Sequence, residues 1–267
     1  MSNTENEWAI KLFNKSVLKQ RKFKQITAFL GPTKKLHCLD VGGDNGVISY
    51  MLRRYGGEWT SADLDATNVA AIKNLVQTNV HQIDGSSTPF RSNEFDRIVI
   101  VDFLEHIPND EQFIAELYRI LRPGGVLVVN VPHIKNGFLR RMRYALGQTD
   151  EKHGHLRPGY TLQGLETLLD DKFLLVKSNT YSKFFSELID VAVVGLVSRI
   201  KKEDGEDSKK GMIITDQDIE RSSFMFGFYS VVYPFIRLFS MLDALLFFRS
   251  GYMLIASAQV NKFQYSP

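Results

Sequence analysis

The sequence predicts an α/β fold built on a doubly wound, Rossmann-like parallel sheet, and three observations lead to this prediction. Short apolar runs alternate with segments of helical periodicity from residue 36 to residue 131, which is typical of parallel strands joined by helices. The first apolar run ends in a glycine turn at residues 42–46, directly before a helical segment. Acidic residues stand where later runs end. Open sheets of this kind bind ligands at the carboxyl ends of their strands.

The expected elements of the first half follow one another closely. Apolar residues at helical spacing, with lysines between them, predict one or two amphipathic helices over residues 8–30. Gly31-Pro32-Thr33 ends them. Strands are expected at 36–41, 58–63, 80–83, 95–101 and 126–131, and helices at 47–54, 69–77 and 110–121.

The second half is less regular. Its pattern predicts a helix at 162–169, a strand at 173–178, an apolar helix at 184–200, a charged loop at 201–211, an aromatic-rich helical stretch at 216–248 and a last strand at 251–260. The chain is therefore expected to divide into N-terminal helices (1–34), a sheet domain (35–180 and 251–262) and a helical insertion (181–250).

Length and composition fit a globular protein with a sizeable core. The chain has 267 residues, 44% of them hydrophobic. Its net charge of +3 does not indicate nucleic-acid binding. A lone cysteine, Cys38, forms no internal disulfide, so a reducing compartment is expected. We expect a cytoplasmic protein that is at most peripheral at a membrane. The start of the chain does not resemble a signal peptide, and a proline and two charged residues interrupt the most apolar stretch, 224–248.

The glycine turn is the most informative segment. Gly42, Gly43 and Gly46 fall within five residues, and only a residue without a Cβ lets the backbone turn this tightly and approach a ligand. Asp40 and Asp44 add two carboxylates. These would repel the pyrophosphate of a dinucleotide, whereas they would suit a ligand with a positive amino-acid end. The structural alternative is a tight strand-to-helix turn that binds nothing.

Two further carboxylates follow the second and third strands. Asp63 comes 23 residues after Asp40, a separation that suits a carboxylate accepting hydrogen bonds from both ribose hydroxyls. Asp65 is an alternative for this role, or the N-cap of the next helix. Asp84, next to Gly85, would accept a hydrogen bond from the exocyclic amine of adenine, or would serve as a turn residue.

Polar residues also gather where the fourth strand ends. Asp102, Glu105 and His106 follow this strand and enter the crevice at the carboxyl edge of the sheet. With this block in place, the chain resembles the class I S-adenosylmethionine-dependent methyltransferases, and within them the branch that includes quinone-biosynthesis and many small-molecule enzymes. The matching blocks, in order and spacing, are residues 40–46, Asp63, Asp84, residues 95–107 and residues 121–125. The resemblance covers about residues 35–133.

The resemblance implies S-adenosylmethionine as cofactor and a seven-stranded sheet with an antiparallel last strand. It implies that Asp40 and the glycine turn hold the methionine end, Asp63 the ribose and Asp84 the adenine. Asp44 departs from the family, which usually has glycine there, and its carboxylate would either contact the methionine ammonium or narrow the pocket. The expected cofactor site comprises Asp40, Gly42, Gly43, Asp44, Gly46, Asp63, Leu64, Asp84, Gly85, Val101 and Asp102.

Methyl transfer from a sulfonium needs mainly positioning, and a hydroxyl acceptor also needs a base. His106 is the expected base, because histidine exchanges protons near neutral pH; a structural role is the alternative. His133, His155 and Tyr160 are expected to contact the acceptor. No metal is expected, because His153 and His155 have no third ligand near them in the sequence.

The insertion allows three interpretations. Its aromatic residues would pack on the sheet as a cap, line a tunnel for a lipid, isoprenoid or polyketide-like acceptor, or lie in a membrane interface with Arg237 and Arg249 at the headgroups. The basic run Arg140, Arg141 and Arg143 would suit an anionic acceptor or lipid headgroups, or would form a solvated helix face.

We therefore predict an S-adenosylmethionine-dependent methyltransferase that acts on a small-molecule or lipid-like acceptor by O- or C-methylation. One alternative is a methyltransferase-like module without turnover that binds a membrane or a partner protein, which Asp44 motivates. Another is a nicotinamide-dependent oxidoreductase, against which the two carboxylates of the glycine turn argue.

Overall fold

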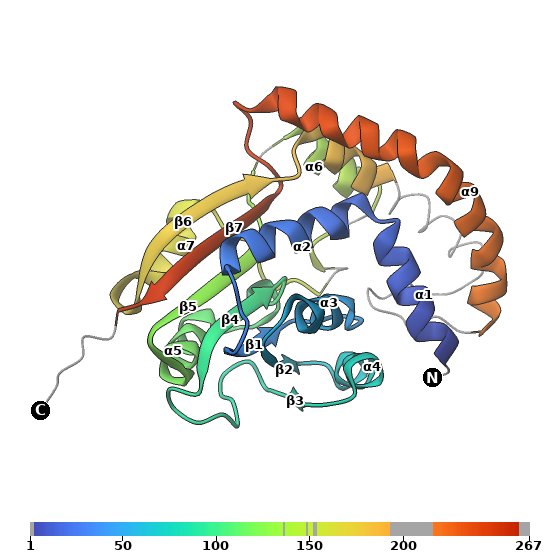
Figure 1. Ribbon diagram of the computed structural model, residues 1–267. Helices are drawn as coiled ribbons and strands as arrows, with labels where there is room; N and C mark the ends of the chain where they lie inside the picture. The colour runs from blue at the N-terminus through green and yellow to red at the C-terminus, as the bar shows by residue number, and fades with distance from the viewer. Residues whose placement is uncertain (1–2, 136, 148, 152–153, 193–215, 262–267) are drawn as a thin grey trace, which may run out of the picture.

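Seven strands form one mixed sheet in a computed structural model that describes residues 3–135, 137–147, 149–151, 154–192 and 216–261 (Figure 1). The strand order is β3–β2–β1–β4–β5–β7–β6. Neighbours from β3 to β5 pair in parallel, and β7 pairs antiparallel with both β5 and β6. The expected sheet with an antiparallel last strand is confirmed. The strands are β1 (His37–Val41), β2 (Glu58–Asp63), β3 (Val80–Gln82), β4 (Phe95–Val101), β5 (Leu121–Pro132), β6 (Phe173–Tyr181) and β7 (Met253–Val260).

Helices cover both faces of this sheet. Buried side chains of α5 and α7 belong to one core cluster, and those of α2 and α3 belong to others that include the opposite face. The α-helices are α1 (Asn3–Asn14), α2 (Val17–Leu30), α3 (Val47–Tyr55), α4 (Ala66–Val76), α5 (Asp110–Ile120), α6 (Phe138–Ala145), α7 (Leu162–Leu169) and α9 (Asp216–Met241). Short 3₁₀ helices are η1 (Leu104–His106), η3 (Asp170–Lys172) and η4 (Leu242–Leu246), and residues 184–192 are also helical.

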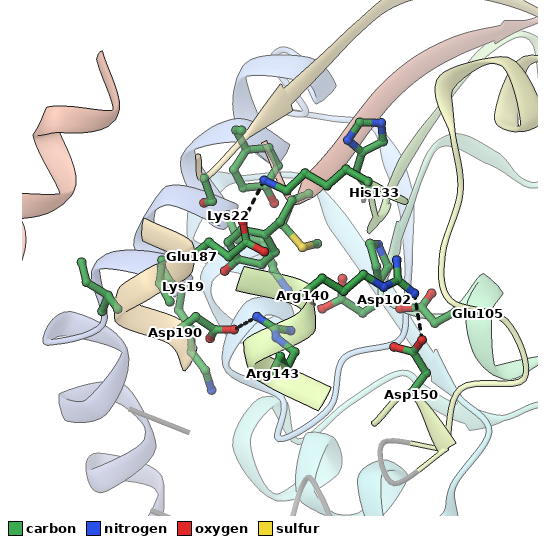
Figure 2. Close-up of a pocket in the computed structure, with 18 of the residues that line it drawn as sticks. Lys19, Lys22, Asp102, Glu105, His133, Arg140, Arg143, Asp150, Glu187 and Asp190 are labelled. Atoms are coloured by element: carbon green, nitrogen blue, oxygen red, sulfur yellow. Dashed lines mark hydrogen bonds and ion pairs between the residues drawn. The ribbon is translucent and has the colours of Figure 1, made fainter. Parts of the chain in front are cut away.

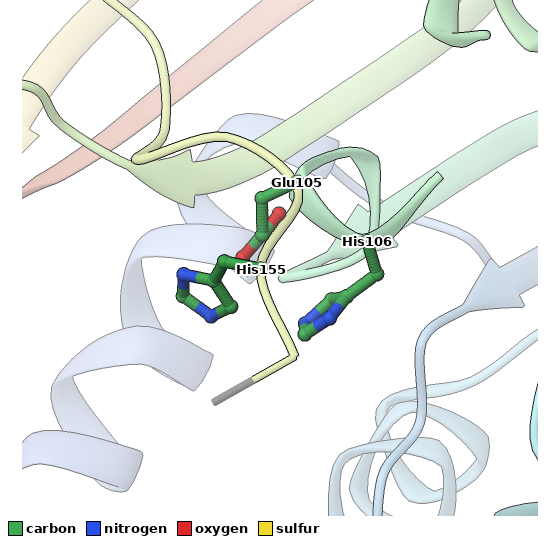
Figure 3. A group of neighbouring side chains, drawn as sticks. All are labelled: Glu105, His106 and His155. Atoms are coloured by element: carbon green, nitrogen blue, oxygen red, sulfur yellow. The ribbon is translucent and has the colours of Figure 1, made fainter. Parts of the chain in front are cut away.

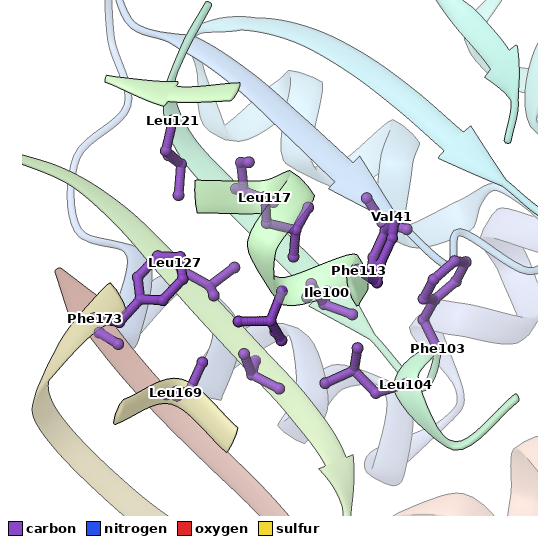
Figure 4. Close-up of a cluster of buried hydrophobic side chains, with 14 of the residues drawn as sticks. Val41, Ile100, Phe103, Leu104, Phe113, Leu117, Leu121, Leu127, Leu169 and Phe173 are labelled. Carbon is purple, nitrogen blue, oxygen red and sulfur yellow. The ribbon is translucent and has the colours of Figure 1, made fainter. Parts of the chain in front are cut away.

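The larger core cluster holds the carboxyl edge of the sheet in place. On α5, Phe113 and Leu117 are fully buried and meet Leu127 of β5 and Leu169 of α7 (Figure 4). Fully burying one such side chain contributes about 1.5–3 kcal/mol. Because this packing fixes β4 and β5 against α5, the segment that leaves β4 enters the crevice in a defined position.

Several boundaries differ from the sequence prediction. The helix expected to end at Leu121 ends one residue earlier, because Leu121 is extended and its backbone pairs with Phe95 at the start of β5. Asp65 caps α4 through Thr67, so that helix begins before residue 69. The prediction did not include α6. Residues 193–215, which contain the end of the expected apolar helix and the charged loop, lie outside the described residues.

Candidate functional site

Close packing of the backbone shapes the glycine turn. Gly42 has φ +85, and a Cβ on it would lie 2.2 Å from the carbonyl oxygen of Val101. Gly46 has φ +81, and its Cβ would lie 2.8 Å from the Cα of Ile72. Asp44, between them, has φ +49. Glycine is favoured at such angles and aspartate is among the few residues that tolerate them, so Asp44 keeps the turn that a glycine would form.

Asp40 lies beneath the turn, with its carboxylate in the protein interior. It is 1% exposed and accepts hydrogen bonds from the hydroxyls of Ser49 (2.5 Å) and Ser61 (2.8 Å). Burial raises the pKa of Asp40, while Ser49, the nearby Arg53 and Ser61 oppose the rise. Both carboxylate oxygens bind serines and brace the turn from below, and a direct contact between Asp40 and the methionine end stays a prediction.

Asp63 lies at the carboxyl end of β2, beside the turn. Its Oδ1 accepts hydrogen bonds from the backbone of Asp65 (3.1 Å) and the side chain of Asn68 (3.1 Å). Burial raises its pKa, and the hydrogen bonds from Asp65, Asn68 and the backbone of Asp44 counter this rise. Asp65 is instead the N-cap of α4. Of the two carboxylates, Asp63 is the one that the backbone of the turn contacts.

Asp84 is an exposed turn residue. Its Oδ1 accepts hydrogen bonds from the backbone N–H groups of Ser86 (2.8 Å) and Ser87 (2.8 Å), and these bonds hold its pKa below the usual range. The structure thus gives Asp84 the turn role that the sequence left open. Gly85 packs closely, since a Cβ on it would lie 2.6 Å from Ile107 and 3.1 Å from Leu64. A contact of Asp84, Gly85 or Leu64 with adenine stays a prediction.

A cavity of about 400 Å³ opens beside the turn (Figure 2). Asp44 and Asp102 of the expected cofactor site line it, together with the expected acceptor residues His133 and His155. Its other walls come from the start of α2, from α6, from residues 182–190 and from Ile236 of α9. The cavity therefore connects the turn with the insertion.

Lys22 of α2 reaches the turn end of this cavity and forms an ion pair with Asp102. Burial alone would lower the pKa of Lys22, but Asp102 raises it, helped by Glu105 and Asp44. Asp102 has φ +46 and accepts a hydrogen bond from Asn130 of β5 (3.1 Å). Three carboxylates thus act on the ammonium of Lys22 at this end.

Ion pairs also line the cavity. Arg140 of α6 pairs with Asp150 (3.1 Å), and Arg143 pairs with Asp190 (2.7 Å) (Figure 2). Lys135 and Glu187 form a third pair (2.7 Å). The expectation that Arg140 and Arg143 serve an anionic acceptor is not supported, because each already faces a carboxylate.

His106 and His155 lie side by side at the edge of the cavity (Figure 3). Their ring centroids are 4.8 Å apart in an edge-on contact, and Nδ1 of His106 lies 3.0 Å from the carbonyl oxygen of Gly154. Side-chain atoms of Glu105, His106 and His155 all lie within 4.8 Å of one another. In the sequence, no third potential metal ligand lies near His153 and His155. The fold brings two such side chains, Glu105 and His106, next to His155. His153 lies outside the described residues. His155 is one of the residues that line the cavity. His106 is not, but it contacts His155.

Tyr160 does not lie in the cavity. It is 7% exposed, and its hydroxyl donates to Asp110 (2.6 Å) and accepts from Arg157 (2.8 Å). Its hydroxyl braces the loop against α5, and a contact of Tyr160 with the acceptor stays a prediction. His133 does line the cavity, with Nδ1 2.9 Å from the carbonyl oxygen of Gly251.

Sequence reasoning missed several lining residues. Lys22 is one of several lysines in an amphipathic helix, and nothing in the pattern distinguishes it. Glu187, Asp190 and Tyr252 come from the insertion and from the start of the last strand, far in sequence from the turn.

Comparison with known proteins agrees with this geometry. Residues 39–129 match a family described as a methyltransferase domain. Over these residues the chain is similar to methyltransferase domains. A ubiquinone biosynthesis O-methyltransferase of Rickettsia canadensis is 25% identical over 111 residues, which are 40% of this chain and 47% of that protein. A sterol 4-C-methyltransferase of Caenorhabditis elegans is 27% identical over 135 residues, 43% of this chain and 40% of that protein.

Among solved structures, the cyclase SpnF superposes with a TM-score of 0.61 at 17% identity, over 90% of this chain and 80% of that one. At this identity the likeness shows a shared fold. The chain spans less than half the length of the two curated relatives named above.

Proposed function

We propose that the protein transfers a methyl group from S-adenosylmethionine to a small, lipid-like acceptor. The observation that carries this proposal is the cavity, whose turn end is lined by carboxylates of the methyltransferase domain and whose far end is built by the insertion. One end suits a positively charged donor, and the other end provides a separate place for an acceptor.

The residues at the turn end fit the cofactor. S-adenosylmethionine supplies a methyl group on a positively charged sulfur that is its own leaving group. The carboxylates of Asp44, Asp102 and Glu105 would favour a sulfonium and an ammonium here. Asp63 would accept the ribose hydroxyls, because it lies beside the turn at the carboxyl end of β2. In-line transfer then depends mainly on positioning.

The insertion end fits an acceptor with little net charge. Its arginines face carboxylates, and Ile189, Ile236 and Met253 add apolar surface to the wall. Such a site favours an apolar molecule with few polar groups. The names of the relatives, one for ubiquinone biosynthesis and one for sterol methylation, support a lipid-like acceptor and leave both O- and C-methylation open.

For a hydroxyl acceptor, the histidine pair is the proposed base. His155 faces the cavity and His106 lies against it, so a proton taken from the acceptor would pass to the pair near neutral pH. We assign His133 to the acceptor wall because it lines the cavity opposite the turn.

We also propose that the protein acts in a reducing compartment, at a membrane surface that supplies the acceptor. The lone thiol, Cys38, is buried, and burial raises its pKa to about 12, which keeps it unreactive. No helix in the described part of the chain is long and apolar enough to cross a membrane.

Methyl transfer is tested with S-adenosylmethionine carrying a labelled methyl group and a panel of catechols, quinols and sterols, with a water-soluble phenol for comparison. We expect label in at least one apolar acceptor. A folded protein that binds the cofactor and labels none of them would favour the module without turnover.

A further inference from the structure

The outer face of α9 is apolar where a surface helix is normally polar. Val231, Phe235, Leu238, Leu242 and Leu245 follow one another at helical spacing and form what we name the α9 stripe. Phe235 is 69% exposed, Leu238 65% and Leu245 68%. In Figure 1, α9 runs along the outer edge of the molecule. Exposed apolar patches of this extent mark interaction sites.

The inward face of the same helix is polar. Ser240 and Asp243 are buried, and Arg21 of α2 donates hydrogen bonds to the side chain of Asp243 (2.8 Å) and the carbonyl oxygen of Ser240 (3.0 Å). Backbone N–H groups of Lys183 and Phe185 also donate to Asp243. These bonds fix the rotation of α9, so the stripe cannot turn inward without breaking them.

The charges around the stripe favour one kind of occupant. Residues 230–250 contain one acidic residue, Asp243, and it is buried. The basic residues of this segment, Arg237 and Arg249, are both exposed. An apolar helix face flanked by cations and free of exposed acids fits an anionic lipid surface, which attracts arginines beside it.

We propose that the α9 stripe docks the protein onto an anionic membrane, with Phe247 and Phe248 inserted beside it. Both phenylalanines are exposed and follow η4 directly. Ile236, on the opposite side of α9, lines the cavity. Docking would therefore place the wall of the cavity next to the bilayer, a short path for a lipid-like acceptor. The delivery of an acceptor from the bilayer rests on the proposed function, whereas the docking itself does not.

Vesicle co-sedimentation tests the docking with the whole chain. We expect the protein to pellet with vesicles of phosphatidylcholine and phosphatidylglycerol, and to pellet less with phosphatidylcholine alone. Replacing Phe235, Leu238 and Leu245 together by glutamine should weaken pelleting at least about tenfold, because three side chains lose their apolar insertion. R237Q with R249Q should remove the preference for the anionic vesicles.

The matched control replaces Leu174 and Val176 of β6, which are 65% and 58% exposed, by glutamine; pelleting should be unchanged. Thermal melting confirms that each variant folds, and calorimetry with S-adenosylmethionine reports the cofactor site separately. A wild-type protein that stays in the supernatant with anionic vesicles overturns the docking, whether or not it binds cofactor. A wild-type dimer that is lost in the triple variant would also overturn the docking, because the stripe would then join two copies of the chain.

Discussion

The two ends of the cavity are built in different ways. At the turn end, backbone packing sets the shape: Gly42 and Gly46 leave no room for a side chain, and Asp40 is locked beneath them. At the insertion end, partly exposed ion pairs such as Arg143 with Asp190 set the shape. Tight backbone packing tolerates little change, whereas exposed ion pairs contribute little stability and are readily exchanged. The comparison teaches that the acceptor end can diverge while the cofactor end stays fixed.

The sharpest test of this contrast is at the turn. G42A should destabilise the protein by about 2–5 kcal/mol, since it adds left-handed strain to a steric clash with Val101. Urea unfolding measures the change. G124A is the control, because Gly124 also has positive φ (+73) but its Cβ would meet nothing closer than 3.8 Å. Equal losses in the two variants would show that packing does not define the turn.

Variants of the histidine pair test its proposed role as base. H106A should lower turnover on a hydroxyl acceptor about a hundredfold if the pair acts as base, with cofactor affinity unchanged. H155A gives the comparison, since His155 lines the cavity directly. Normal turnover in H106A would make that residue structural.

Asp63 tests the ribose side of the turn end. D63A should weaken the binding of S-adenosylmethionine by about 1–3 kcal/mol, the cost of leaving polar partners unsatisfied. D65A is a close control: it removes the cap of α4, so it should lower stability by about 0.5–2 kcal/mol without changing cofactor affinity. Calorimetric titration separates the two. Equal affinities in D63A and the wild type would remove Asp63 from the site.

The smallest effect is expected at the insertion end. A double-mutant cycle of R143Q and D190N should give a coupling energy below about 1 kcal/mol, because both side chains are about one-quarter exposed. Thermal or urea unfolding measures the cycle. A coupling of several kcal/mol would mean that this end is as rigidly built as the turn, and the contrast between the two ends would fail.

Local signals predicted the turn end well. The bounds of β2 and β4 match the predicted ranges, and the turn follows from its glycines. The partners of Asp40 could not be predicted, because a buried carboxylate and a ligand-binding one look alike until Ser49 and Ser61 are seen to bind it. The partners of Tyr160 could not be predicted for a similar reason, since Asp110 lies on another element.

Long-range contacts explain why other residues of the cavity were not predicted from the sequence. Lys22 enters the cavity because α2 packs across the sheet, and Glu105 meets His155 because a loop far along the chain returns to η1. The helix α6 is only eight residues long and carries three arginines among its apolar residues, so its pattern gave a weak signal. The acceptor end is assembled from such contacts, so it was the less predictable end.

Calorimetric titration of the wild-type protein with S-adenosylmethionine, and separately with a nicotinamide dinucleotide, tests the central claim most directly. The carboxylates of the turn end should favour the sulfonium compound and repel the pyrophosphate, so we predict saturable binding of the first and no measurable binding of the second. A folded protein that shows no heat with S-adenosylmethionine, or that prefers the dinucleotide, would contradict the account.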